Sequence, residues 1–326
     1  MKSRKILTGL VAASVLLGCS GCSSTKTDSK GNDIVASIKG KNFTADDIYN
    51  DIYDTNGASY YYAACLQAII DQKFPVDDDI QTDADTIVSK IKSYYKSTYG
   101  DDSYKSQLKS ALSSSGYSSI SAYKDAMIQQ IQYSKYLLHY VDNNFDTVFN
   151  DYYNSSSPRI LAMIKISVSD TSSLTTDEQS KVTEVQNLLA TNKSFGDIAK
   201  DYSDDDDTKN NQGSLGVVDS TTGLSSTYGD DIETNALALN EGEVSGAITG
   251  TDGIYFLKCT STSKSKIKKE LKNTDIDSPL ISYDSKMQYK AFKAYKFKYA
   301  SKKVKKKVDA YITEQLNSTS SDTEAQ

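Results

Sequence analysis

The chain has 326 residues, of which 25% are charged, and a formal net charge of −6. This length supports two domains once an N-terminal leader is set aside. Beyond the leader no apolar run approaches about 20 residues, which argues against a chain that spans a membrane. We expect no nucleic-acid partner, because the N-terminal residues predict export from the cytoplasm.

Residues 1–18 have the features of a bacterial signal peptide. Basic side chains within residues 2–5 form a positive n-region, and residues 6–17 supply an apolar core of the usual length. The core ends in Leu-Leu-Gly before Cys19, which is typical of a lipobox whose cysteine is lipidated. Cys22 is the alternative attachment site, and an ordinary cleaved signal peptide is the alternative to lipidation. Residues 19–32 are mostly small and polar, which predicts a flexible tether.

Residues 33–157 predict a helical segment. It opens with a short strand and turn at 34–43, followed by Thr-Ala-Asp-Asp at 44–47, a pattern that caps a helix and places acids in its first turn. Apolar spacing predicts further helices over 84–99, 104–112 and 121–141. The only histidine, His139, lies in the last of these among apolar neighbours, so we interpret it as a structural or exposed residue.

Residues 158–262 predict a second, strand-containing domain that begins at Pro158. Residues 159–167 are β-rich and alternate in part, which predicts a strand. A capped amphipathic helix is expected over 176–190, and a closing strand over 253–259.

No metal or cofactor is expected. Cys65 and Cys259 lie in different regions and are predicted to be buried free thiols, with a disulfide as the alternative. Cys and His residues do not have zinc-ligand spacing. The acidic run at 204–207 lacks the alternation of a calcium loop, so a solvated loop is favoured over a Ca²⁺ site.

Residues 263–317 predict a C-terminal helical segment, with a lysine-rich helix over 285–316, and residues 318–326 predict a disordered polar tail. Residues 264–307 hold fifteen lysines and four acids, whereas 23–263 hold nineteen basic and thirty-five acidic residues. The lysines could face an anionic membrane or wall polymer, attract acidic or unfolded clients, or simply solvate a helix that pairs with the acidic N-terminal helices.

Four stretches of the second domain carry a family resemblance. They read SFGDIAKDYS at 194–203, QGSLG at 212–216, LNEGEVS at 239–245 and TDGIYFLK at 251–258. Their order and spacing resemble the parvulin-type peptidyl-prolyl isomerase domain. Together with the opening strand and helix start, the order of segments is similar to that of the PrsA-type foldase lipoproteins of Gram-positive bacteria.

The resemblance implies an α+β fold. A helical chaperone domain of the SurA/PrsA type would be made from the N- and C-terminal segments, with the parvulin-like α/β domain inserted between them. It also implies an extracytoplasmic, lipid-anchored foldase whose partners are unfolded or partly folded exported proteins. A homodimer is compatible with the sequence, but nothing in the sequence demands one.

The family's active-site residues can be placed on this chain one by one. The first histidine falls on Met163 and the second on Tyr255, while the central acid falls on Asp205. The apolar pocket residues fall near Tyr228 and Ile232. Because both histidines are replaced, we expect a fold and a peptide-binding groove that are retained, with weak catalysis or none. An active isomerase with a non-standard site is the alternative, and a solute-binding transport lipoprotein is a third reading.

Overall fold

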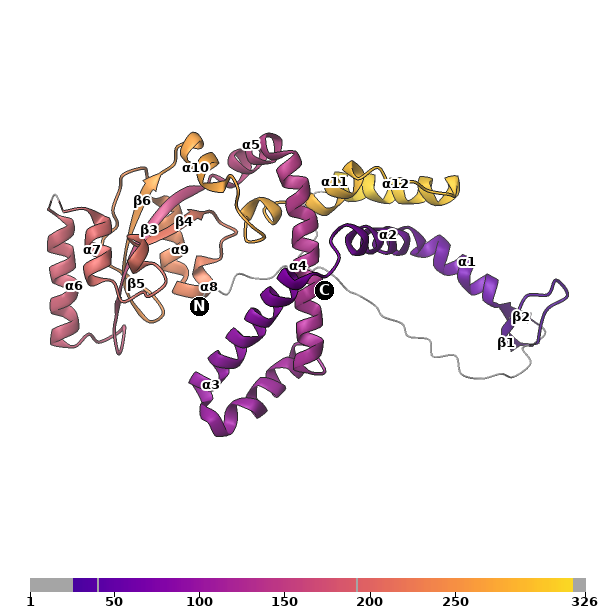
Figure 1. Ribbon diagram of the computed structural model, residues 1–326, viewed down its shortest axis with the longest axis horizontal. Helices are drawn as coiled ribbons and strands as arrows, with labels where there is room; N and C mark the ends of the chain where they lie inside the picture. The colour runs from indigo at the N-terminus through magenta and orange to yellow at the C-terminus, as the bar shows by residue number, and fades with distance from the viewer. Residues whose placement is uncertain (1–25, 40, 192, 319–326) are drawn as a thin grey trace. The chain divides into compact units, whose positions relative to one another are not determined.

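The computed structural model describes residues 26–39, 41–191 and 193–318 (Figure 1). The described chain divides into two compact units. One comprises residues 141–285, and the other comprises residues 26–140 together with 286–318. The predicted signal peptide, Cys19, Cys22 and the tail after residue 318 lie outside the described residues. Within the described ranges, no helix combines the length and apolar character needed to cross a bilayer.

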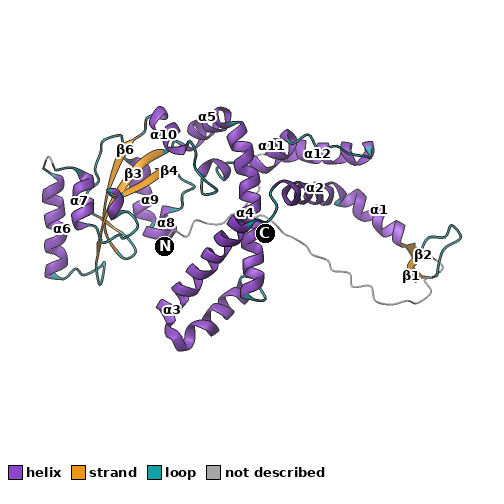
Figure 2. Ribbon diagram, viewed as in Figure 1, coloured by secondary structure: helices purple, strands orange, loops and turns teal. Residues whose placement is uncertain are grey.

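The unit of residues 141–285 is built on a four-stranded antiparallel sheet (Figure 2). The strands, in the order β4-β3-β6-β5 across the sheet, are β4 (Ser214–Val218), β3 (Arg159–Ser167), β6 (Gly253–Ser261) and β5 (Ile248–Thr249). Both central strands carry apolar side chains on both faces, as a sheet covered on both sides requires. The strands predicted over 159–167 and 253–259 are thus confirmed.

Each face of this sheet packs against its own pair of helices. On one face, Ile164 and Phe256 pack with the apolar residues of α6 (Thr176–Leu189) and α7 (Phe195–Tyr202). On the other, Met163 and Tyr255 pack with residues of α8 (Leu224–Tyr228) and α9 (Asp230–Ala238). The alternation of side chains along a strand therefore assigns Met163 and Tyr255 to the α8–α9 face.

Two further helices, α5 (Phe145–Ser156) and α10 (Lys264–Leu271), belong to the same unit, as does the 3₁₀ turn η2 (Pro279–Ile281). Lys268 of α10 forms an ion pair of 2.7 Å with Asp146 of α5, and the Tyr153 hydroxyl donates to the Thr262 carbonyl at 2.8 Å. The sequence pattern predicts residues 141–157 and 263–285 as parts of the helical segments. Their contacts instead place them in the unit that contains the four-stranded sheet.

The unit of residues 26–140 and 286–318 is mainly helical. It begins with a two-stranded antiparallel hairpin of β1 (Ile34–Ile38) and β2 (Lys41–Thr44). Its helices are α1 (Ala45–Thr55), α2 (Gly57–Lys73), α3 (Asp78–Ser114), α4 (Ile120–Asn143) as far as residue 140, α11 (Met287–Ala294) and α12 (Lys302–Asn317). Thr44 forms the predicted cap of α1, because its side chain accepts from the Asp47 N–H while the Asp47 carboxylate accepts from the Thr44 N–H.

Segments from the two ends of the chain pack together in this helical unit. The Tyr62 ring of α2 lies 4.9 Å from Phe292 and 5.7 Å from Tyr311, measured between ring centroids. Lys307 of α12 forms an ion pair of 2.8 Å with Asp54 of α1. One predicted role of the lysine-rich segment, pairing with acidic N-terminal helices, is therefore realised at Lys307.

Two helix boundaries differ from the sequence prediction. The helices expected over 84–99 and 104–112 belong to α3, which turns sharply at Gly100 (φ 74°, ψ 168°). The single helix expected over 285–316 was wrong, because α11 ends at Ala294 and α12 begins at Lys302. Lys296 between them has a φ of 53°, a left-handed conformation that a continuous α-helix does not contain.

Candidate functional site

The residues predicted for the parvulin site converge on one face of the sheet. Met163 in β3 and Tyr255 in β6 lie in paired strands, where Lys165 is opposite Tyr255 and Met163 is opposite Leu257. Met163 and Tyr255 are thus diagonal neighbours on one face, both fully buried. Ile232 of α9 is fully buried in the same cluster, and Tyr228 of α8 is half-buried against it.

The Tyr255 hydroxyl is held by a carboxylate that sequence reasoning missed. It donates a short hydrogen bond to Asp252, whose other carboxylate oxygen accepts from Lys165 Nζ at 2.6 Å. The Tyr228 ring stands edge-on to Tyr255, with centroids 5.6 Å apart and planes inclined by 64°. The hydroxyl is therefore the last group in a series of hydrogen bonds that runs from Lys165 through Asp252.

The pKa values of the groups in and beside this hydrogen-bond series follow from burial and charge. Burial and the bond to the Asp252 carboxylate raise the pKa of Tyr255. Burial, followed by the charge of Asp205, raises the pKa of Tyr228 to about 12. Although burial opposes the change, the hydrogen bonds from Lys165 and Tyr255 lower the pKa of Asp252. Near neutral pH both tyrosines are therefore neutral hydroxyls beside an ionised Asp252.

Asp205 lies close enough for its charge to act on both tyrosines, but its carboxylate has another partner. The Thr208 hydroxyl donates to it in a short hydrogen bond, and Thr208 is itself buried. The loop that carries Asp205 is held against β3, because the Asp204 N–H donates to the Lys165 carbonyl at 2.7 Å. The structure thus brings Asp205 into the neighbourhood of Tyr255 without joining the two by a hydrogen bond.

Two glycines permit close backbone approach at this site. A Cβ on Gly250 would lie 2.4 Å from Tyr255 Cε2 and 2.6 Å from the Tyr228 carbonyl oxygen. Gly213 has a φ of 77°, and its Cβ would lie 2.4 Å from the Met163 carbonyl oxygen. Its own carbonyl accepts from the Met163 N–H at 2.8 Å. Gly213, the first glycine of the QGSLG stretch, therefore fixes the loop against β3.

The arrangement provides hydrogen-bond donors but no imidazole. The Met163 thioether is only a weak acceptor, and the Tyr255 hydroxyl is already engaged. His139 belongs to α4, in the helical unit. Met163, Tyr255 and Ile232 thus form a packed core, and it has no group that titrates near neutral pH in the positions of the two histidines.

Other features of this domain have simpler roles. The Asp204 carboxylate accepts from Lys181 at 2.7 and 2.8 Å, and Asp206 pairs with Lys209, so lysines neutralise part of the acidic run. Cys259 is buried and free, as predicted, whereas Cys65, in the helical unit, is free but only half-buried.

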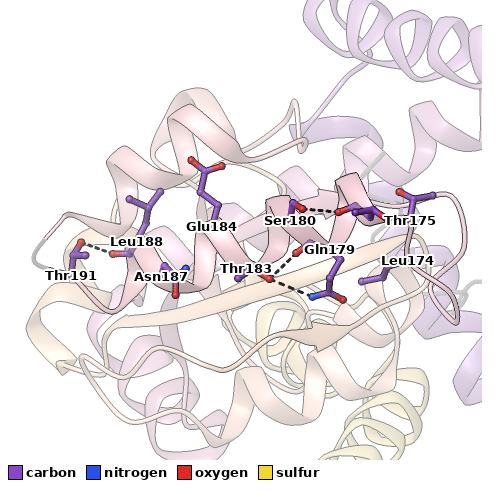
Figure 3. A pocket seen from close by; sticks show the side chains of 10 residues that line it. Leu174, Thr175, Gln179, Ser180, Thr183, Glu184, Asn187, Leu188 and Thr191 are labelled. Carbon is purple, nitrogen blue, oxygen red and sulfur yellow. Dashed lines mark hydrogen bonds between the residues drawn. The ribbon is translucent and has the colours of Figure 1, made fainter.

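A surface pocket of about 740 Å³ lies along α6, away from the residues predicted for the parvulin site (Figure 3). Most of the lining residues are polar, but several of their hydroxyls donate to carbonyls of the helix itself. Ser180 donates to the Thr176 carbonyl at 2.7 Å, and Thr183 donates to the Gln179 carbonyl at 2.8 Å. We therefore assign no chemistry to this pocket.

Comparison with known proteins agrees with the resemblance seen in the sequence. Residues 162–261 match the rotamase family, described as the PPIC-type PPIASE domain. Foldase protein PrsA 2 of Listeria monocytogenes is 27% identical over 306 residues, covering 90% of this chain and 89% of the relative. Foldase protein PrsA of Staphylococcus epidermidis is 27% identical over 318 residues, covering 94% and 91%.

Among solved structures, PrsA from Bacillus subtilis matches with 19% identity and a TM-score of 0.39, covering 85% of this chain and 98% of that one. The α+β organisation predicted from the sequence is also what the described elements show. Residues 162–261 therefore form a PPIC-type rotamase domain, in a chain that is similar to PrsA foldases over 90% of its length.

Proposed function

We propose that this protein is an extracytoplasmic foldase that assists exported proteins, with a rotamase domain that binds peptide and isomerises proline bonds weakly or not at all. The foldase assignment rests on the rotamase domain and on the extent of the similarity to PrsA foldases. The catalytic part of the proposal rests on the site itself.

The catalytic part of the proposal is supported by the burial of Met163 and Tyr255 and by the hydrogen bond of the Tyr255 hydroxyl. Both side chains are fully buried in the core beneath α8 and α9, and the Tyr255 hydroxyl is committed to Asp252. Rotation about an X-Pro bond has a barrier of about 18–20 kcal/mol, so a catalyst must stabilise the twisted amide by several kcal/mol. A thioether and an engaged phenol offer little of that stabilisation.

A genuine isomerase with a non-standard site is the second candidate. The chain of hydrogen bonds from Lys165 through Asp252 to Tyr255, with Asp205 nearby, is the observation that favours it. The Tyr255 hydroxyl would then be the essential donor. Loss of proline isomerisation in Tyr255→Phe would identify this mechanism.

The reading as a solute-binding transport protein is not supported. Such proteins need two α/β lobes built from repeated strand–helix units with parallel strands. The described strands instead form one four-stranded antiparallel sheet and one two-stranded hairpin.

We also propose that the chain is anchored to the outer face of the cell membrane by a lipid on Cys19. The support is the n-region, apolar core and lipobox of the sequence. Metabolic labelling with a fatty-acid analogue tests this directly in Cys19→Ala and Cys22→Ala variants. We expect label to be lost only in Cys19→Ala, while loss only in Cys22→Ala would move the anchor to the alternative cysteine.

The foldase proposal predicts that the purified mature chain suppresses aggregation of a chemically unfolded secreted protein and raises its refolded yield. Tyr255→Phe should act as well as the parent chain, because holding a client does not need the hydroxyl. Absence of any effect on several unfolded secreted proteins would contradict the proposal.

A further inference from the structure

A second cavity, of about 460 Å³, lies in the helical unit where α3 turns back at Gly100. Its lining comes from the part of α3 before the turn, the part after it, and the start of α4. The lining residues are Lys92, Tyr104, Lys105, Leu108, Lys109, Leu112 and residues 118–120. The volume is within the range of ligand-binding pockets, which is about 300–1,000 Å³.

Apolar side chains form the floor of this cavity. Leu108 and Leu112 are buried there, and the half-buried Tyr104 and Ile120 continue the surface. Ser119 contributes little free polarity, because its hydroxyl accepts from the Ala122 N–H at 3.1 Å at the start of α4. The floor thus suits an apolar side chain of a ligand.

Three exposed lysines, Lys92, Lys105 and Lys109, belong to the same lining. None of them forms an ion pair with a carboxylate in the part of the chain that the structure describes. Other lysines nearby do have such partners: Lys96 pairs with Asp101 at 2.7 Å, and Lys124 pairs with Asp85 at 2.7 Å. The cavity therefore combines an apolar floor with three lysines that have no ion-pair partner among the described residues, one of which, Lys105, lies over the Tyr104 ring at 5.9 Å.

We infer that this cavity binds acidic, apolar segments of unfolded client chains, with a leucine- or phenylalanine-sized side chain on the floor and flanking aspartate or glutamate at the lysines. This inference rests on the proposed foldase function and names the class of segment that the helical unit recognises. Charge complementarity selects the segment, because an apolar peptide with flanking lysines would bring like charges together.

Binding of labelled synthetic peptides to the full mature chain tests the inference. One peptide carries Leu-Phe flanked by Asp and Glu, and the other carries the same apolar residues flanked by Lys. Fluorescence anisotropy should show tighter binding of the acidic peptide, with an affinity that falls as salt is raised. Replacing Lys92, Lys105 and Lys109 together by Gln should weaken it by about tenfold, as the sum of three exposed charge contacts.

A matched control replaces three exposed lysines outside the cavity, Lys90, Lys302 and Lys306, by Gln. It changes the net charge equally and should alter acidic-peptide binding by less than about twofold. Replacing the cavity lysines by Glu should reverse the preference toward the Lys-flanked peptide. All of these positions are exposed, so the variants should fold, and far-UV circular dichroism verifies this.

The two proposals fail separately. If the parent chain suppresses client aggregation but the cavity and control variants bind the acidic peptide equally, the cavity inference is wrong and the foldase proposal stands. If the acidic peptide binds and the cavity variant loses it, yet no client is protected from aggregation, the foldase function is wrong. Equal binding of both peptides by the parent chain would also overturn the inference.

Discussion

Replacing Gly250 by alanine should disturb the rotamase site more than its size suggests. The new methyl carbon would lie 2.4 Å from Tyr255 Cε2 and 2.6 Å from the Tyr228 carbonyl oxygen. The first distance is about 1 Å shorter than carbon–carbon contact allows. The Tyr228 carbonyl cannot easily retreat, because it accepts from the Thr251 N–H at 2.9 Å. The Tyr255 ring must therefore move, which strains its bond to Asp252.

The cost of this overpacking is about 1–3 kcal/mol. Alanine reduces the entropy of the unfolded chain, which returns about 0.4–1 kcal/mol. We therefore expect Gly250→Ala to lower the free energy of unfolding of the rotamase domain by about 1–2 kcal/mol. Gly246→Ala is the matched control, because nothing lies within 4 Å of the point that its new methyl group would occupy and its φ is not in the left-handed region.

Urea unfolding followed by far-UV circular dichroism measures the difference between the two glycine variants. Because the chain has two units, amide hydrogen exchange in β6 is needed to locate the loss. Protection of the β6 amides should fall in Gly250→Ala and stay unchanged or rise in Gly246→Ala. Equal protection in the two variants would refute the packing argument at Tyr255.

Three further predictions concern backbone conformation, pH and the packing of α12. Gly213→Ala should destabilise the rotamase domain more than Gly216→Ala in urea unfolding, since both have positive φ (77° and 71°) but only Gly213 meets backbone within 4 Å. The Glu178 carboxylate accepts backbone N–H bonds that lower its pKa from 4.5 to about 2, so its stabilising effect is complete above pH 4.5 and is lost as pH falls toward 2. The Glu178→Gln variant should therefore be less stable at pH 7 and should lose less stability between pH 5 and 2 in acid titrations followed by circular dichroism. Lys307→Gln should lower the stability of the helical unit by about 1 kcal/mol, because it removes both the cation–π contact with the Tyr53 ring at 3.9 Å and the ion pair with Asp54. The exposed neighbour substitution Lys306→Gln should be neutral in thermal unfolding.

Local patterns in the sequence predicted much of the fold. Alternation in residues 159–167 identified β3, and the Thr175-to-Glu178 capping box begins α6 where the apolar pattern starts. The break between α11 and α12 was missed because the apolar spacing continues through it. The short helix α10 and the helix α5 were also not predicted as separate elements, since their apolar faces are defined by packing within the sheet unit.

Only the part of the site that follows from residue positions within the strands could be predicted from the sequence. Met163 and Tyr255 were placed through the family pattern, and β3–β6 pairing brings them together. Lys165 could have been found, because it lies two residues after Met163 and so points to the same face of the strand. Asp252 could not have been found in this way, because its hydrogen bond with Tyr255 depends on the turn between β5 and β6.

The measurement that tests the central claim most directly is the exchange rate between the cis and trans forms of a proline tetrapeptide, followed by NMR with the mature chain and with Tyr255→Phe. The same preparation must first be shown to suppress aggregation of an unfolded secreted protein, which establishes that it is active. We expect the exchange rate to stay at or close to its uncatalysed value with both chains, as a site without histidines implies. Acceleration by the parent chain that disappears in Tyr255→Phe would contradict this account and establish a tyrosine-dependent isomerase.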